Sequence, residues 1–166
     1  MKLCMIGTGY VGLVSGTCFA DIGNQVYCVD KDRSKIDKLN SGVSPIYEPG
    51  LDELIKKNYN ANRLIFTTDI KKAINYSDII FICVGTPTKK RSLKVDLSFV
   101  YKCVKEILNH TKKKKIIVTK STVPVGTGDE IEKIIKRKKK LFSVISNPEF
   151  LREGEAIRDF KYPDRI

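Results

Sequence analysis

Six short apolar runs alternate with helix-like segments along the chain, and this alternation constrains the fold more than any other feature. The runs are continuously apolar, which is typical of strands covered on both faces. They span residues 2–6, 25–29, 64–67, 79–84, 115–119 and 141–145, and helical patterns lie between them over 11–22, 34–40, 51–59, 70–75, 97–109 and 129–136. The order predicts an α/β fold: a Rossmann-like, doubly wound, mostly parallel sheet of about six strands with helices on both faces.

The chain is predicted to form one domain over residues 1–166, because it contains no internal repeat and no Ser/Gly-rich linker. A hydrophobic fraction of 42% favours a globular protein. The longest irregular connection is GVSPIYEPG at 42–50, which two prolines and two glycines keep out of regular structure. A loop of that length is either a functional lip or a topological crossing, and both interpretations stay open.

The segment GTGYVG at 7–12 is a GxGxxG motif that follows a predicted strand and opens a predicted helix. In that context Gly7 is expected to permit a tight turn, and Gly9 to let the backbone approach a pyrophosphate. Gly12 is expected to allow close packing of the helix on the strand. The N-terminus of the helix then offers unpaired N–H groups and a positive dipole end to phosphates. The motif predicts a dinucleotide-binding site.

Asp30 ends the second predicted strand, 21 residues after Gly9, where an acid can accept hydrogen bonds from an adenosine ribose. A carboxylate there repels a 2′-phosphate, so NAD is favoured over NADP. Nearby Lys31, Arg33 and Lys35 soften this preference, since cations can accommodate extra negative charge. The alternative for Asp30 is a helix cap or a surface acid.

Two further polar turns follow predicted strands. Thr86 lies in FICVGTP, and Ser121 and Thr122 lie in KSTVPVG. Ligands collect at the carboxyl ends of the strands in open α/β sheets, so these side chains are expected to face the cofactor. Ordinary turn chemistry is the alternative for Thr86.

The net charge of +12 raises the question of nucleic-acid binding. Basic runs occur at 112–115 and 136–140, with a smaller group at 89–91. No aromatic residue interleaves the two long runs, so they lack a stacking platform and are interpreted as solvated helix ends and turns. We expect no nucleic-acid partner.

The longest apolar run, 79–84, is far too short to span a membrane, and no leader pattern precedes the first strand. A cytoplasmic location without a membrane partner is therefore expected. Five cysteines without CxxC spacing are expected to be buried thiols in a reducing compartment. The single histidine, His110, has no partner cluster, and no metal site is expected.

Six motifs together resemble the nucleotide-sugar 6-dehydrogenases, and within them the UDP-glucose branch: IGTGYVGLVSG, PIYEPGLDELI, FICVGTPT, KSTVPVG, SNPEFLREGEAIRDF and YPDRI. They occur in that order across essentially the whole chain. The resemblance implies NAD-dependent oxidation of UDP-glucose to UDP-glucuronate by two successive hydride transfers at C6. In this family the reaction passes through an aldehyde and a thioester on a cysteine.

The resemblance also implies roles for individual residues. Glu149 matches the family's acid near the reacting carbon, and Thr122 helps to hold the water used in proton transfer. The remaining implied contacts are to NAD, from Tyr10, Val11, Asp30, Lys35, Thr86, Thr122 and Glu153, and to the UDP-sugar, from Glu149, Phe150, Leu151, Arg152 and Glu153. The alternatives are a helix-capping acid for Glu149 and exposed helix charges for Arg152 and Glu153.

The family's nucleophilic cysteine belongs to a downstream segment and a second domain, which nothing in this sequence matches. Cys83 and Cys103 have no base motif nearby, so neither is expected to be the nucleophile. The leading interpretation is an N-terminal NAD-binding domain shortened by truncation or gene splitting. We expect it to bind NAD weakly, to lack turnover alone, and to need the missing half or a homodimer partner.

Two alternatives to this interpretation remain. One is a sister dehydrogenase for GDP-mannose or a UDP-N-acetylhexosamine. The other is a non-catalytic, truncated dinucleotide-binding remnant.

Overall fold

The structure of the protein is a computed structural model that describes residues 1–89, 94–138 and 140–164. Parts of three predicted features lie outside these residues. They are Lys90 and Arg91 of the small basic group, Lys139 of the second long basic run, and the last two residues of the YPDRI motif.

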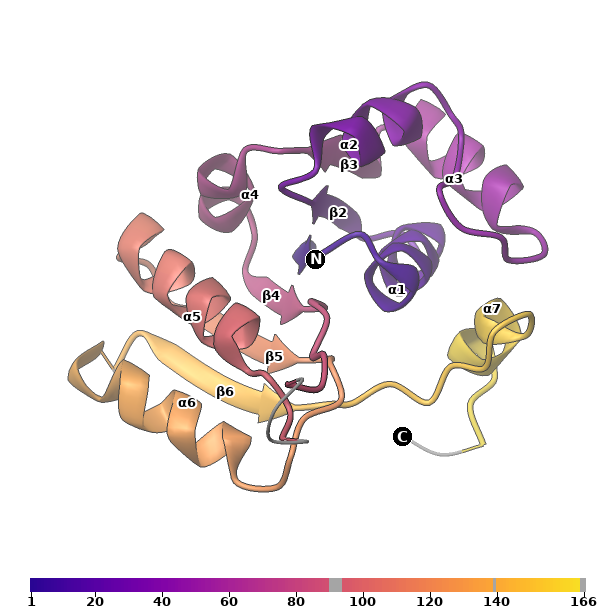
Figure 1. The fold of residues 1–166 in the computed structure, drawn as a ribbon. Helices are drawn as coiled ribbons and strands as arrows, with labels where there is room; N and C mark the ends of the chain where they lie inside the picture. Colours follow the sequence, from indigo (N-terminus) through magenta and orange to yellow (C-terminus); the bar gives the residue numbers. More distant parts are fainter. Residues whose placement is uncertain (90–93, 139, 165–166) are drawn as a thin grey trace.

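A six-stranded sheet forms the centre of the molecule, with the strand order β3-β2-β1-β4-β5-β6 (Figure 1). The strands are β1 (Lys2–Ile6), β2 (Gln25–Val29), β3 (Leu64–Thr67), β4 (Ile79–Ile82), β5 (Lys115–Thr119) and β6 (Phe142–Ser146). All five pairings between these strands are parallel. The predicted doubly wound α/β fold is therefore confirmed, and its sheet is parallel throughout the described strands.

Helices cover both faces of the sheet (Figure 1). One apolar cluster joins one face to α1 (Tyr10–Asp21), α2 (Arg33–Asn40), α3 (Leu51–Asn60) and α7 (Ala156–Lys161). A second cluster joins the other face to α4 (Ile70–Tyr76), α5 (Ser98–His110) and α6 (Thr127–Ile135), which continues into a short 3₁₀ helix, Lys136–Lys138. Because both faces are buried, the strands read as continuous apolar runs.

The predicted boundaries need small corrections. The fourth strand ends at Ile82, not at 84, because the carbonyl of Val84 accepts a hydrogen bond from the Ser121 hydroxyl (2.6 Å) instead of a strand N–H. The last predicted helix starts two residues earlier, after Gly126, whose φ of +88° turns the chain into α6. The other boundaries are identical or differ by one residue.

Helix α7 was not predicted, since the polar segment from residue 146 onward carries no long periodic pattern. After β6 the chain crosses the carboxyl edge of the sheet and places α7 beside α1 (Figure 1). The rings of Phe19 and Phe160 meet edge to face, with centroids 4.9 Å apart. Asp21 at the end of α1 accepts hydrogen bonds from Lys57 and Lys161, each at 2.8 Å. These contacts tie α7 to α1 and α3.

No helix in the described ranges is long and apolar enough to cross a membrane. Within the same ranges, no group of His, Cys, Asp and Glu side chains could hold a metal ion. The five cysteines are free and buried.

Candidate dinucleotide-binding site

The loops that follow β1, β2, β4, β5 and β6 all lie at the carboxyl edge of the sheet, because its strands are parallel. The direction of the strand order reverses between β1 and β4. Ligands of open α/β sheets bind at such a switch point. The predicted site residues belong to these loops.

The glycine turn after β1 has the predicted geometry. Gly7 has a φ of +105°, and a Cβ there would lie 2.6 Å from the carbonyl oxygen of Cys83. A Cβ on Gly12 would lie 1.9 Å from the carbonyl oxygen of Gly7. By contrast, a Cβ on Gly9 would meet nothing within 4 Å, so this position faces open space. Gly7 and Gly12 serve close packing, while Gly9 leaves room for a ligand.

The N-terminus of α1 is not capped by a side chain. Gly9 is the N-cap residue and makes no side-chain hydrogen bond, and the first turn contains no acidic residue. The first intrahelical bond is from Leu13 N–H to the Gly9 carbonyl (2.9 Å), so the N–H groups of the residues between them point outward from the helix end. These N–H groups and the helix dipole fit a pyrophosphate.

Asp30 lies beside this helix end, half-buried, in a fixed orientation. The N–H and hydroxyl of Thr8 both donate to its Oδ2, each at 2.9 Å, and the Asp32 N–H donates to Oδ1 at 3.0 Å. Burial alone would raise the pKa of Asp30, but these hydrogen bonds and the nearby Lys35 hold it below its ordinary value. Asp30 is thus an ionised acceptor of the kind that an adenosine ribose requires.

Thr8 was missed by the sequence interpretation, because the GxGxxG pattern permits any residue at this position. In the structure Thr8 is 1% exposed, and it connects the glycine turn to Asp30 through its hydrogen bonds.

The structure brings Thr86 and Thr122 together. The hydroxyl of Thr86 donates to the carbonyl oxygen of Thr122 at 3.0 Å. The neighbouring Ser121 uses its hydroxyl internally, on the carbonyl of Val84, and so joins the ends of β4 and β5. The Thr122 side chain is exposed at the sheet edge.

Lys120 is a second residue that the sequence did not single out. It is 8% exposed, and its Nζ donates to Oδ1 of Asn147 at 3.2 Å. Burial lowers the pKa of Lys120, and the negative charge of Glu149 acts in the opposite direction. A buried cation therefore lies beside the chain where it leaves β6. The sequence shows Lys120 within the run KSTVPVG, but it does not show that this lysine is buried.

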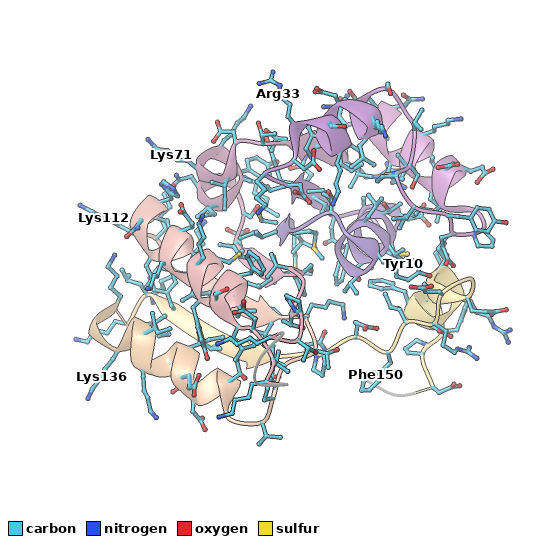
Figure 2. All side chains as sticks on the ribbon, in the orientation of Figure 1. Tyr10, Arg33, Lys71, Lys112, Lys136 and Phe150 are labelled. Atoms are coloured by element: carbon cyan, nitrogen blue, oxygen red, sulfur yellow. The ribbon has the colours of Figure 1, made fainter. Side chains whose placement is uncertain are left out.

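In segment 149–153, two charged side chains bond nearby parts of the chain. Glu149 Oε2 accepts the N–H of Leu151 at 2.6 Å, so this carboxylate closes a local turn. Arg152 forms a two-pronged ion pair with Asp159 of α7, at 3.0 and 2.6 Å, which directs its guanidinium toward the helix. Phe150 and Glu153 are exposed, and Phe150 projects from the crossing segment in Figure 2.

Glu48 is the third residue that sequence reasoning missed. It is 6% exposed, and it bonds the hydroxyl of Tyr10 and the N–H groups of Gly154 and Ala156. The irregular loop 42–50 therefore reaches the site, which favours the functional-lip interpretation over a simple crossing. The available signal was one acid between two prolines in PIYEPG.

The buried cysteines lack the properties of nucleophiles. Burial raises the pKa of Cys83 to about 12 and that of Cys103 to about 11. Both thiols are therefore protonated at neutral pH, and the expectation that neither is the reactive cysteine stays a prediction.

Comparison with known proteins gives consistent matches. The family model described as "UDP-glucose/GDP-mannose dehydrogenase family, NAD binding domain" matches residues 1–166. A UDP-glucose 6-dehydrogenase of Rhizobium meliloti (strain 1021) is 56% identical over 168 residues, which cover 100% of this chain and 38% of the relative.

Two solved structures share the fold closely. A GDP-mannose dehydrogenase from Pseudomonas aeruginosa superposes with a TM-score of 0.91 at 40% identity, covering 98% of this chain and 39% of that chain. A UDP-glucose dehydrogenase from Pyrobaculum islandicum gives a TM-score of 0.91 at 37% identity, over 99% of this chain and 39% of that chain. The chain thus spans about two fifths of the length of the proteins that it matches.

Proposed function

The chain belongs to the UDP-glucose/GDP-mannose dehydrogenase family as its NAD binding domain, and from this premise we propose that it serves the oxidation of UDP-glucose to UDP-glucuronate. The cofactor of the domain is NAD. The observation that carries the proposal is the uncapped N-terminus of α1 beside Asp30, which Thr8 holds in place as an acceptor.

Each part of this site has a defined task in the proposal. The N–H groups of Tyr10, Val11 and Gly12 bind the pyrophosphate, and the open space at Gly9 admits it. Asp30 accepts hydrogen bonds from the adenosine ribose, with Lys35 nearby. The linked Thr86 and Thr122 contact the cofactor farther along the sheet edge, and Glu153 contacts it from the crossing segment.

When bound, NAD would supply the acceptor for the hydride removed from C6 of the sugar. In the proposal Glu149 handles the proton of the reacting alcohol, and the exposed hydroxyl of Thr122 holds the water through which the proton leaves. Lys120 provides a fixed positive charge near Glu149. Phe150, Leu151 and the backbone of Arg152 form the near side of the sugar site.

UDP-glucose is preferred as substrate because the chain is 56% identical to a UDP-glucose 6-dehydrogenase and 40% identical to a GDP-mannose dehydrogenase. Since the chain spans 38% of the former's length, we propose that it binds NAD but does not turn over alone. Residues beyond this sequence, from the other half of the enzyme or a homodimer partner, complete the reaction. The free cysteines are consistent with a reducing cytoplasm as its location.

Cofactor binding is tested by titrating the purified chain with NADH and following its fluorescence. Asp30→Asn is expected to weaken binding about tenfold or more, because it removes a charge-assisted hydrogen bond to the ribose. Asp37→Asn is the matched control: it makes the same charge change on the exposed face of α2 and should leave the affinity unchanged. Equal effects of the two substitutions would contradict the assignment of Asp30.

Turnover is tested by following NADH production from UDP-glucose, first with this chain alone and then with the remaining part of a relative's enzyme added in trans. We expect none in the first case and activity in the second. A panel with GDP-mannose and a UDP-N-acetylhexosamine distinguishes the sister reactions. Turnover by the chain alone would contradict the proposal that it only binds NAD. Inactivity with every added enzyme part and every substrate would favour a non-catalytic remnant.

A further inference from the structure

Glu48 is a buried carboxylate without a cationic partner among the residues that the structure describes. It lies in the irregular loop between α2 and α3 and is 6% exposed. Burying a carboxylate away from water is costly unless hydrogen bonds compensate for the lost hydration. Its partners therefore show what the residue does.

The two oxygens of Glu48 bind the start of α7 and the turn before it. Oε1 accepts the N–H of Ala156 at 2.8 Å and, more weakly, that of Ile157 at 3.5 Å. Oε2 accepts the N–H of Gly154 at 2.8 Å. Helix α7 has no side-chain cap from its own N-cap residue, so Glu48 supplies from a distant loop the acceptor that a local cap would provide.

Tyr10 connects this carboxylate to the dinucleotide site. Its hydroxyl donates to Glu48 Oε2 and accepts the N–H of Gly154 at 3.2 Å. Burial and the bond to Glu48 raise the pKa of Tyr10, so the hydroxyl keeps its proton at neutral pH. Tyr10 is also the first residue of α1, immediately after Gly9, so its backbone belongs to the helix end proposed for the pyrophosphate.

We propose that Glu48 and Tyr10 couple occupancy of the dinucleotide site to the ordering of segment 149–157. Glu48 is a positioning residue that holds this segment at the sheet edge, and Tyr10 is the link between the segment and the bound cofactor. The inference rests on the proposed function, since it assigns an internal coupling to the same site.

The physical basis is shared ordering. A ligand held by the backbone at the start of α1 restricts the motion of Tyr10, and a fixed Tyr10 reduces the entropy lost when the segment docks. By linkage, a docked segment must strengthen cofactor binding by the same factor that the cofactor strengthens docking. The coupling thus brings the residues proposed to face the sugar into place when cofactor is present.

The test measures amide hydrogen exchange of Gly154, Ala156 and Ile157 by NMR in the full chain, without and with saturating NADH. In the wild type, NADH is expected to slow their exchange about fivefold or more, the lower end of ordinary coupling between sites. Tyr10→Phe removes the hydroxyl with its contacts to Glu48, Gly154 and the Arg152 carbonyl, and leaves the bonds from Glu48 to the segment. This variant should keep its basal protection at Ala156 and Ile157 and lose most of the effect of NADH.

Glu48→Gln supplies the reciprocal measurement. The amide can still accept from Ala156, but its NH₂ group faces the donors Gly154 and Tyr10. We expect lower basal protection and a weaker NADH affinity, reduced by no more than the factor by which NADH protects the segment in the wild type. Glu53→Gln, the same charge change on the exposed surface of α3, is the control and should change neither quantity.

The outcomes separate the coupling from the proposed function. NADH binding without added protection in the wild type would overturn the coupling alone, as would full NADH-induced protection in Tyr10→Phe. Unchanged exchange and affinity in Glu48→Gln would also overturn it. Absence of NADH binding by the wild-type chain would overturn the coupling and the proposed function together.

Discussion

At Gly12, helix α1 lies so close to the glycine turn that a Cβ would stand 1.9 Å from the Gly7 carbonyl oxygen and 3.0 Å from Cys83 Cβ. The neighbouring atoms are backbone or buried, so they cannot move aside cheaply. The same argument holds at Gly16, where a Cβ would lie 2.6 Å from Cys28 Sγ. The glycines therefore fix the distance between helix and sheet.

Gly12→Ala is expected to destabilise the domain by about 1–3 kcal/mol through overpacking and to weaken NADH binding. Gly128→Ala in α6 is the matched control, because a Cβ there meets nothing within 4 Å. The control should be neutral or slightly stabilising, by about 0.5–1 kcal/mol. Urea unfolding measures the free energy of unfolding of both variants. Equal values for the two would contradict the close-packing argument.

The roles of Gly7 and Gly12 could be predicted because they follow from spacing within one local turn. Those of Thr8, Glu48 and Lys120 could not, since each depends on a partner distant in sequence. Glu48 and Ala156, for example, are 108 positions apart. A single sequence does not show which polar side chain such distant packing will bury. The assignments of the cofactor and sugar contacts remain predictions until the titrations above are made.

At the scale of elements, the docking of α7 depends on charges as well as on the Phe19–Phe160 contact. The hydrogen-bonded ammonium groups of Lys161 and Lys57 hold the pKa of Asp21 well below its usual range. A carboxylate with a lowered folded-state pKa stabilises the fold fully above the unfolded-state pKa. This stabilisation is lost as the pH falls through the folded-state value.

Asp21→Asn is therefore expected to lower the stability at neutral pH by about 1–2 kcal/mol. The difference from wild type should shrink as the pH falls below about 4, the ordinary pKa of an aspartate. Urea unfolding across this pH range measures it. Asp37→Asn, whose pair with Arg33 is exposed and 4.0 Å long, should stay within about 0.5 kcal/mol of wild type. A constant difference at all pH values would argue against the ion pairs.

Elements with a strong local pattern were predicted well, as their bounds agree within two residues. Strands such as Lys2–Ile6 could be predicted because helices cover both faces of the sheet, which makes each strand a continuous apolar run. Helix α7 escaped prediction because six residues give less than two turns of periodicity, and because its capping acid, Glu48, lies in another loop.

At the scale of the whole molecule, the described residues of the two long basic runs and the dinucleotide site lie at opposite ends of the sheet. The helices run antiparallel to the strands that they connect, so α5 and α6 end at the amino edge. Figure 2 shows Lys112 and Lys136 there, far from Tyr10. At physiological salt, the interaction between exposed charges is largely screened beyond about 8 Å. These lysines therefore have little influence on cofactor binding.

The double substitution Lys112→Gln/Lys136→Gln is therefore expected to change the NADH affinity less than twofold at physiological salt. Fluorescence titration at low and physiological salt measures it. A large loss at physiological salt would place a phosphate contact in the basic runs and contradict the separation of the two ends.

The hydrogen bonds of Glu48 affect the order in which the protein folds. The bond from Ala156 to Glu48 joins residues 108 positions apart, and the bond from Gly154 to Tyr10 joins residues 144 apart. Contacts of such long sequence separation form late, after most of the loop-closure entropy has been overcome by the sheet. On the ribosome, the glycine turn and Glu48 emerge early, but Glu48 cannot bind the segment until residues 154–157 have emerged. The contacts of Glu48 with α7 therefore form only after all six strands of the sheet have been synthesised, although Tyr10 belongs to α1.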